Sequence, residues 1–270
     1  MERPDGYDWP VIQSGGKRMY NAENCMEATG AYYSKWLGQD GILNPDWKGV
    51  EYVYSEQRNT VQQGYAHRFD IYALCQKDRI VVSYGDRTGN RLDAMKSQIR
   101  DAMPAEEVRR ILEKIFQRNT YDNMKYVFKN MPDIPSDAKA LALEDYREYA
   151  DFWRKCNPGC KNTEWLKEYF EEMAQAHMCI GMYRDGGIVS CTDAPDMPYM
   201  GEQMQEIGIN TLREYRGKGY AAMACSKCLQ EMAAHHKIPL WSTSADNLAS
   251  RRLAQKIGFA EYAEVISVTL

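Results

Sequence analysis

Apolar residues at helical spacing predict two amphipathic helices in the first half of the chain. In each set the apolar side chains fall on one face at a period of 3.6 residues. The first set consists of Cys25, Ala28, Tyr32, Tyr33 and Trp36. The second follows Pro104 and two acidic residues, a typical helix start, and consists of Val108, Ile111, Leu112, Ile115 and Phe116. Residues 38–48 between them have the composition of a loop.

Two pairs of β-prone runs predict hairpins, one in each half of the chain. Residues 69–75 and 79–84 are separated by three polar residues. Residues 178–183 and 188–192 flank a turn that contains Asp185-Gly186, and Asp-Gly is a strong hairpin signal. A further apolar run over 204–212 predicts one more strand.

The segment KNMPDIPSDAK, with Pro132 and Pro135, interrupts this pattern and predicts a boundary. We therefore divide the chain into an N-terminal α+β region, 1–135, and a C-terminal domain, 136–270. The second part is predicted to alternate helices and strands. Its helices are expected at 144–155, 163–176, 218–235 and 249–256, and its remaining strands at 138–143, 239–245 and the C-terminus. The fold class is α/β, with a mixed α+β sheet.

One segment of the C-terminal domain has the pattern of an anion-binding loop. The predicted strand 204–212 leads into Arg216-Gly217-Lys218-Gly219-Tyr220-Ala221, and a helix follows directly. Glycines let backbone N–H groups approach a ligand closely, and the helix start adds unpaired N–H groups and a positive dipole end. Since the loop also carries Arg216 and Lys218, it suits a pyrophosphate.

The spacing of this loop resembles a known motif. Arg216, Gly219 and Ala221 match Arg/Gln-x-x-Gly-x-Gly/Ala, the coenzyme A pyrophosphate loop of the GNAT superfamily of N-acetyltransferases. The phrase NLASRRLAQKIGF, which Asn247 opens, is similar to the closing helix of that family. The resemblance covers about residues 138–270 and is nearest to the zwittermicin A resistance acetyltransferases.

The resemblance implies a C-terminal GNAT acetyltransferase fold and transfer of an acetyl group from acetyl-coenzyme A to an amine, by direct attack in a ternary complex. It implies a small-molecule amine as partner, no metal, and a monomer or homodimer. Backbone N–H groups of the strand before the loop would polarise the thioester. The implied coenzyme A-binding residues are Thr211, Leu212, Arg216, Gly217, Lys218, Gly219, Tyr220, Ala221, Asn247, Ser250 and Arg251.

Glu206 is the candidate general base. An alkyl amine with a pKa near 10 is mostly protonated at neutral pH, so some group must accept its proton. Glu206 opens the strand before the loop, where several enzymes of the family carry their base. A solvated carboxylate at the end of a strand is the alternative interpretation. The family also implies that the polar loops 157–162 and 193–203 line the acceptor site.

The closing helix departs from the family in one position. Many GNAT enzymes place a tyrosine there as the acid for the departing thiolate, and by spacing from Asn247 this position is Ala254. Ser250, Tyr220 and Tyr262 are the candidates to replace it, or no acid is needed, since a thiolate is a fair leaving group. The departure keeps open an alternative function, a non-catalytic sensor that binds acyl-coenzyme A.

Composition excludes several function classes. A net charge of −4 with 44% hydrophobic residues argues against a nucleic-acid binder, and no run approaches the ~18 apolar residues of a membrane span. The N-terminus is polar and carries acids, unlike a signal peptide, so we expect a cytoplasmic protein. The pairs Cys225/Cys228 and Cys156/Cys160 could be zinc ligands, but buried helix cysteines are the preferred interpretation.

The N-terminal region has apolar stripes that need a partner surface. We expect it to pack against the acceptor side of the C-terminal domain and to wall off that cleft. We also expect residues 136–270 to supply all strands of their own sheet.

Overall fold

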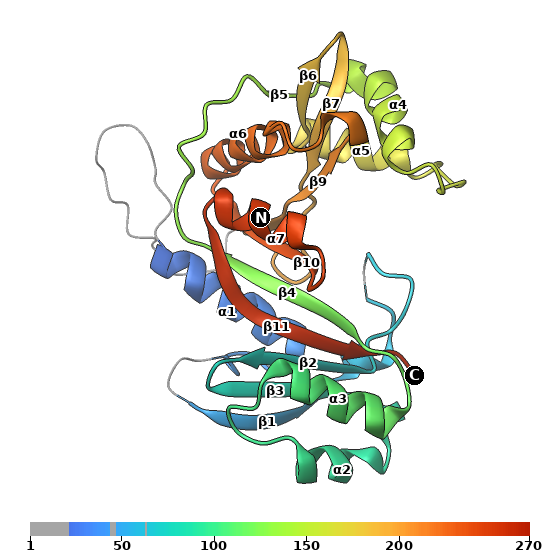
Figure 1. Ribbon diagram of the computed structural model, residues 1–270, viewed down its shortest axis with the longest axis vertical. Coiled ribbons are helices and arrows are strands. Elements are labelled where there is room, and N and C mark those ends of the chain that lie inside the picture. Colours follow the sequence, from blue (N-terminus) through green and yellow to red (C-terminus); the bar gives the residue numbers. More distant parts are fainter. Residues whose placement is uncertain (1–21, 44–46, 63) are drawn as a thin grey trace, which may run out of the picture.

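The computed structural model describes residues 22–43, 47–62 and 64–270, which form two sheets and their covering helices (Figure 1). The helices are α1 Ala22–Leu37, α2 Arg91–Gln98, α3 Ala105–Phe116, α4 Tyr146–Cys156, α5 Leu166–Gln175, α6 Tyr220–Ala234 and α7 Leu248–Lys256. The strands are β1 Gly49–Tyr54, β2 Ile71–Gln76, β3 Arg79–Tyr84, β4 Tyr121–Phe128, β5 Lys139–Ala140, β6 Ile180–Arg184, β7 Gly187–Asp193, β8 Met204–Glu206, β9 Gly208–Thr211, β10 Ile238–Ser244 and β11 Phe259–Val268. The predicted mixed α/β fold class is confirmed.

Both predicted hairpins are present, and the predicted helices form within a few residues of their expected bounds. β2 pairs with β3 and β6 pairs with β7, antiparallel in both cases. α3 begins directly after Pro104 and buries Val108, Leu112 and Phe116 of the predicted stripe. Three elements were not predicted from the sequence: β1, α2 and β4.

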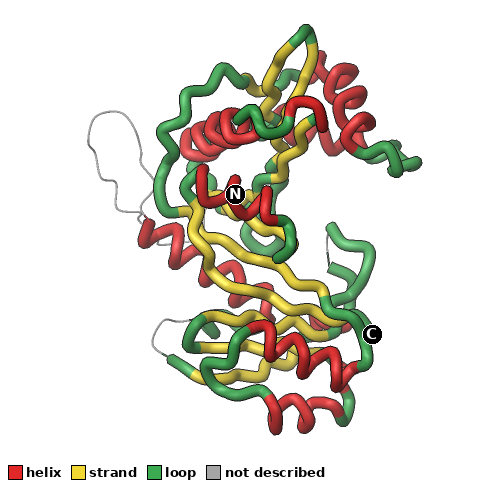
Figure 2. The backbone as a smooth tube through the Cα atoms, viewed as in Figure 1, coloured by secondary structure: helices red, strands yellow, loops and turns green. Residues whose placement is uncertain are grey.

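The larger sheet has seven strands in the order β1-β3-β2-β11-β4-β10-β8, and the smaller has four in the order β5-β6-β7-β9. Figure 2 shows them as separate groups of strands. α2 and α3 lie over one face of the larger sheet and share a core with its strands β2, β3 and β11. α1 packs into the other core, which continues from the larger sheet to the smaller sheet.

The predicted strand 204–212 is two strands that belong to different sheets. β8 pairs with β10, and this pairing ends where the Ile207 N–H donates to the Leu240 carbonyl at 3.1 Å. From Gly208 onward, β9 pairs instead with β7. A side chain at Gly208 would overlap the Asp193 carboxylate, so glycine is required where the chain changes sheets.

Strand β4 joins the two predicted regions into one sheet. It lies between β10 and β11 and pairs antiparallel with both. β11, the last strand of the chain, also pairs with β2. The expectation that residues 136–270 supply all strands of their sheet is therefore wrong, because β4 precedes Pro132. The division at residue 135 implies that residues 136–270 fold independently; this stays untested, and the shared sheet leads us to expect that they do not fold alone.

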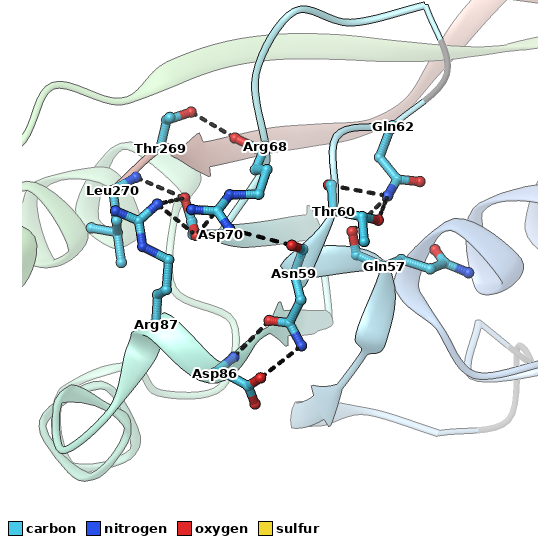
Figure 3. Close-up of polar contacts among 10 residues, drawn as sticks. All are labelled: Gln57, Asn59, Thr60, Gln62, Arg68, Asp70, Asp86, Arg87, Thr269 and Leu270. Carbon is cyan, nitrogen blue, oxygen red and sulfur yellow. Dashed lines mark hydrogen bonds and ion pairs between the residues drawn. The ribbon is translucent and has the colours of Figure 1, made fainter.

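A polar network fixes the C-terminal end of β11 to the segment between β1 and β2 (Figure 3). The buried Asp70 carboxylate accepts a hydrogen bond from the Leu270 N–H at 2.7 Å and lies 3.4 Å from the Arg87 guanidinium. The Arg68 guanidinium donates to the Asn59 carbonyl, and the Asn59 side-chain amide donates to Asp86. This network holds both ends of the segment 59–70.

The short 3₁₀ helix Glu56–Asn59 and strand β3 cap the C-terminus of α1. Side chains of Gln57, Arg58 and Ser83 donate to the carbonyls of Lys35, Trp36 and Leu37 at 3.1, 2.9 and 2.8 Å. The last carbonyls of a helix have no partner within it, so these bonds replace water that burial excludes. The positive charge of Arg58 also suits this end of the helix dipole.

A fragment that begins at Ser136 tests whether the C-terminal domain folds independently. It lacks β2 and β4, so β10 would have one unpaired edge and β11 two, and we expect no cooperative thermal unfolding transition by circular dichroism. Co-expression with residues 1–135 should restore a folded complex, since the sheet can then assemble from two chains. Cooperative unfolding of residues 136–270 alone would show that β4 is dispensable.

Candidate functional site

The predicted anion-binding loop lies at the start of α6 and is open to solvent. Gly217 and Gly219 have φ of 75° and 86°, in the left-handed region that glycine tolerates best. No side chain caps α6, and a Cβ built at either glycine would meet no atom within 4 Å. The N–H groups of the first helical turn therefore face a space that a ligand can fill.

Side chains around the loop hold it in this conformation. The Arg216 Nε donates to the Thr211 carbonyl at 3.1 Å and so ties the loop to the end of β9. The Tyr215 hydroxyl donates to Asp185 at 2.7 Å, and the Lys218 Nζ lies 5.0 Å from the centroid of the Tyr215 ring. Both cations of the loop are exposed, so they add positive charge beside the open helix end.

Two further predicted residues join β9 to β7. The Thr211 hydroxyl hydrogen-bonds with the Ser190 hydroxyl at 2.8 Å, and the Leu212 N–H donates to the Val189 carbonyl at 3.0 Å. These contacts continue the pairing of the smaller sheet up to the loop. Thr211 and Leu212 therefore belong to the part of the chain that pairs with β7, beyond the point where pairing with β10 ends.

Asn247, Ser250 and Arg251 lie at the start of α7, where their side chains have protein partners. The Asn247 side chain accepts a hydrogen bond from the Ser250 N–H at 3.1 Å and caps the helix. The Ser250 hydroxyl accepts from the Trp241 indole, and Arg251 pairs with Glu261 at 2.9 Å. These contacts build the helix end, and the predicted role in coenzyme A binding stays a prediction.

Glu206 lines a small cavity between α1, β2, β4 and β8. The cavity has a volume of about 10 Å³, which is the space of one water molecule. Its lining consists of Tyr32, Tyr33, Trp36, Tyr65, Tyr72, Lys125, Met197 and Glu206. Glu206 is thus half-buried and faces phenol rings, which is a different setting from a solvated strand end.

Lys125 is a lining residue that sequence reasoning missed. It lies on β4 and is buried, and none of the described carboxylates is within 4.0 Å of its ammonium group. Burial lowers the pKa of Lys125, and the negative charge of Glu206 acts against this shift. In the sequence, Lys125 is marked only as a charged residue within an apolar run, and that run was not recognised as a strand.

A second acid lies where the chain changes sheets. The Asp193 carboxylate contacts Gly208 and accepts a hydrogen bond from the Tyr169 hydroxyl at 2.7 Å. Burial raises the pKa of Asp193, the Tyr169 hydrogen bond lowers it, and the nearby charge of Glu206 raises it further. Two carboxyl groups therefore flank Ile207, in different environments.

The structure places the three candidates for the general acid at separate positions. Ala254 is fully buried in α7. Tyr262 stacks on Tyr33 with ring centroids 5.6 Å apart, and burial raises its pKa to about 12. Tyr220 is the first residue of α6, with the Arg184 guanidinium 5.0 Å from its ring centroid. Ser250 lies at the start of α7, so the identity of the acid stays open.

The cysteine pairs do not form a shared cluster. Cys225 and Cys228 are buried within α6, whereas Cys156 is half-buried and Cys160 is exposed. Among the described residues, no group of three His, Cys, Asp or Glu side chains could hold a metal ion. Within the same ranges, none of the helices combines the length and apolar content that crossing a bilayer requires.

The family model of the GNAT acetyltransferases matches residues 96–265, more than half of the chain. The chain belongs to the GNAT acetyltransferase family. The match begins ahead of the predicted boundary at residue 135 and includes β4. None of the curated proteins compared with the chain matches it significantly.

Solved structures with a similar fold include several acetyltransferases. One is a GNAT acetyltransferase from Colwellia psychrerythraea, 15% identical, with a TM-score of 0.49 over 57% of this chain and 58% of that one. A GCN5-related N-acetyltransferase from Sphaerobacter thermophilus is 14% identical, with a TM-score of 0.49 over 60% and 55%. A ribosomal-protein-alanine N-acetyltransferase from Brucella melitensis is 19% identical, with a TM-score of 0.36 over 46% and 92%. The chain thus covers less than two thirds of the first of these relatives.

The burial of Lys125 predicts a specific pH dependence of stability. Between its lowered folded-state pKa and the ordinary value near 10.4, the unfolded chain binds more protons, so the contribution of this residue to the free energy of unfolding rises with pH. Lys125→Met should remove that rise, measured by urea unfolding at several pH values from neutral to mildly alkaline. Lys114→Met, at an exposed position on α3, is the control. Parallel pH profiles for wild type and Lys125→Met would contradict the assignment.

Proposed function

We propose that the chain transfers an acetyl group from acetyl-coenzyme A to the amino group of a small-molecule acceptor, by direct attack in a ternary complex. The observation that carries the proposal is the divided strand β8–β9, which leads through the glycine loop to the uncapped start of α6. This arrangement supports a site for a thioester beside the strand and a pyrophosphate at the helix end.

The proposed binding of the cosubstrate follows from the loop. The pyrophosphate would accept hydrogen bonds from N–H groups at the start of α6, with Arg216 and Lys218 adding charge. Beyond Ile207 the chain no longer pairs with β10, so backbone N–H groups on that side are available to polarise the thioester carbonyl. No side chain is needed for that step.

Glu206 is the proposed proton acceptor. Glu206 lies directly before the position where the strand changes sheets, which would place it near an amine that attacks the thioester. The cavity that it lines has room for one water molecule, which could relay the proton. Transfer of one proton to Glu206 leaves a neutral amine as nucleophile, and the nitrogen loses its second proton as the carbon–sulfur bond breaks, so that coenzyme A ends as the thiol. The released thiolate has a low enough basicity to depart without an acid from the Ala254 position.

The N-terminal region supplies most of the cavity wall, which supports its proposed role as the acceptor side of the cleft. Tyr32, Tyr33 and Trp36 come from α1, and Tyr72 from β2. The finer resemblance to zwittermicin A resistance acetyltransferases stays a prediction, and an antibiotic-like amine, a polyamine and an amino acid are the small-molecule candidates for the acceptor. We also propose that the protein is cytoplasmic and acts as a monomer or homodimer.

Gly219→Asp tests the coenzyme A loop. The variant places a carboxylate where the pyrophosphate would bind, and uncompensated like-charge contact should weaken affinity by about 100-fold or more in calorimetry with coenzyme A. Gly219→Ala measures the separate effect of a side chain at positive φ. Gly89→Asp is the matched control, since Gly89 also has positive φ and open space but lies far along the chain from the loop. Unchanged affinity in Gly219→Asp would refute the loop assignment.

Glu206→Gln tests the proton acceptor. A positioned general base contributes roughly 10²- to 10⁴-fold, so turnover near neutral pH should fall at least about tenfold. Raising the pH should restore part of it, because the amine then loses its proton in solution. The control is Glu107→Gln, at an exposed position on α3, outside the cavity and the predicted acceptor loops. Turnover within about threefold of wild type, with coenzyme A affinity intact, would place the base elsewhere. If wild type binds acetyl-coenzyme A but acetylates no amine, the sensor alternative holds.

A further inference from the structure

Arg58 is a fully buried guanidinium on the acceptor side of the molecule. It belongs to the short 3₁₀ helix Glu56–Asn59 and has no exposed surface. Its Cζ lies 5.4 Å from the Trp36 ring centroid and 5.3 Å from that of Tyr72. Both rings also line the Glu206 cavity, so the cation and the proposed base flank the same aromatic walls.

Most of the hydrogen-bonding capacity of Arg58 is unused. Its Nη2 caps the Trp36 carbonyl at 2.9 Å, but its Nε and Nη1 are buried without a hydrogen-bond partner. The indole Nε1 of Trp36, whose ring packs against this guanidinium, is also buried and unpartnered. Buried donors are nearly always paired in folded proteins, so three such atoms in one cluster indicate an acceptor group that binds there.

The charges around the cavity point to the same conclusion. Arg58 and Lys125 are two buried cations, whereas Glu206 is the only carboxylate among the lining residues. Within the described ranges, none of the carboxylates is within 4.0 Å of the Arg58 guanidinium. Contact with aromatic faces offsets part of the cost of burying a cation, but it leaves the in-plane N–H groups without acceptors. A ligand with a negative charge would supply what the protein does not.

We propose that the acceptor carries a carboxylate besides its amino group, and that Arg58 binds this carboxylate while the amino group lies at Glu206. The proposal rests on the acetyl transfer proposed above and names its substrate class. The planar fork of a guanidinium matches two carboxylate oxygens, and the rings of Trp36 and Tyr72 would pack against the carbon skeleton between the two ends. The acceptor is thus an amino acid or a similar amino carboxylate.

In this structure a contact between the segment 59–62 and the loop that carries Tyr199 covers the cluster around Arg58. The Tyr199 hydroxyl donates to the Gln62 Oε1 at 2.5 Å, and the Tyr199 ring packs against Trp36 with centroids 6.0 Å apart. Asn59 anchors the start of the segment 59–62 to Asp86 (Figure 3). An acceptor would therefore separate Tyr199 from Gln62 and leave the contact between Asn59 and Asp86 in place. An acceptor would enter between these two segments.

Binding measurements on matched acceptors test the proposal directly. Calorimetry with wild type and saturating coenzyme A would compare glycine with methylamine, leucine with isopentylamine, and phenylalanine with phenethylamine. We expect at least one amino acid to bind about tenfold or more tightly than its amine, because a charge-assisted pair to a buried cation is lost in the amine. Arg58→Met should abolish that difference. Arg118→Met, which removes an exposed arginine outside the cluster, should leave it unchanged.

Several results would overturn the proposal. These are equal binding of each amino acid and its amine, no amino acid binding at all, or an unchanged preference in Arg58→Met. If Arg58→Met does not fold, Arg58→Lys replaces it, since lysine keeps the charge but lacks the fork, and the preference should still fall. Phosphoethanolamine against ethanolamine distinguishes a phosphate ligand, whose exclusive binding would also refute the carboxylate. Carboxylate binding without acetyl transfer would refute the proposed reaction alone, whereas transfer to amines without carboxylate preference would refute this inference alone.

Discussion

The change of sheet between Ile207 and Gly208 is the constraint on which the rest of the structure depends. On one side of it the chain completes the larger sheet through β10, and on the other it completes the smaller sheet through β7. Gly208 is needed there because the Asp193 carboxylate occupies the space of a side chain. The two sheets diverge from this position, and the loop at the start of α6, the acid Glu206 and the cavity are all placed relative to it.

The larger sheet shows how the N-terminal region contributes to the family fold. Family membership covers residues 96–265, and β4 within that range supplies the strand between β10 and β11. Because β4 also carries Lys125, the same strand stabilises the sheet and lines the cavity beside Glu206. α1 adds the aromatic wall, and its C-terminus is capped by the segment that carries Arg58. The proposed acceptor site and the larger sheet therefore share strand β4.

Local patterns predicted both hairpins and the helices other than α2, because their signals repeat within a few residues. The stripe of α3 and the Asp185-Gly186 turn are examples, and both formed as expected. β4 was missed because Asp122 and Lys125 interrupt its apolar pattern and both of its partner strands lie over 100 residues away. The split of 204–212 was missed because alternation along a strand carries no information on which sheet it joins.

Only part of the candidate site, likewise, could be predicted from the sequence. The glycine loop has a motif with fixed spacing, so Arg216, Gly219 and Ala221 could be named from the sequence. Arg58 and Lys125 have no such motif, and only burial without a carboxylate partner distinguishes them from other basic residues. A buried charge becomes visible only when the fold is known, because burial depends on contacts between distant segments.

The proposed reaction, transfer of an acetyl group from acetyl-coenzyme A to an amine by direct attack, determines where the acetyl group must be found. The most direct measurement uses acetyl-coenzyme A labelled in the acetyl carbon, with a panel of amines and amino acids, followed by mass spectrometry of the small molecules and of the intact protein. Direct attack predicts label on the nitrogen of an acceptor, thiol release in equal amount, and a protein of unchanged mass. Bound coenzyme A with no labelled acceptor, or a labelled protein that forms before any product, would contradict it.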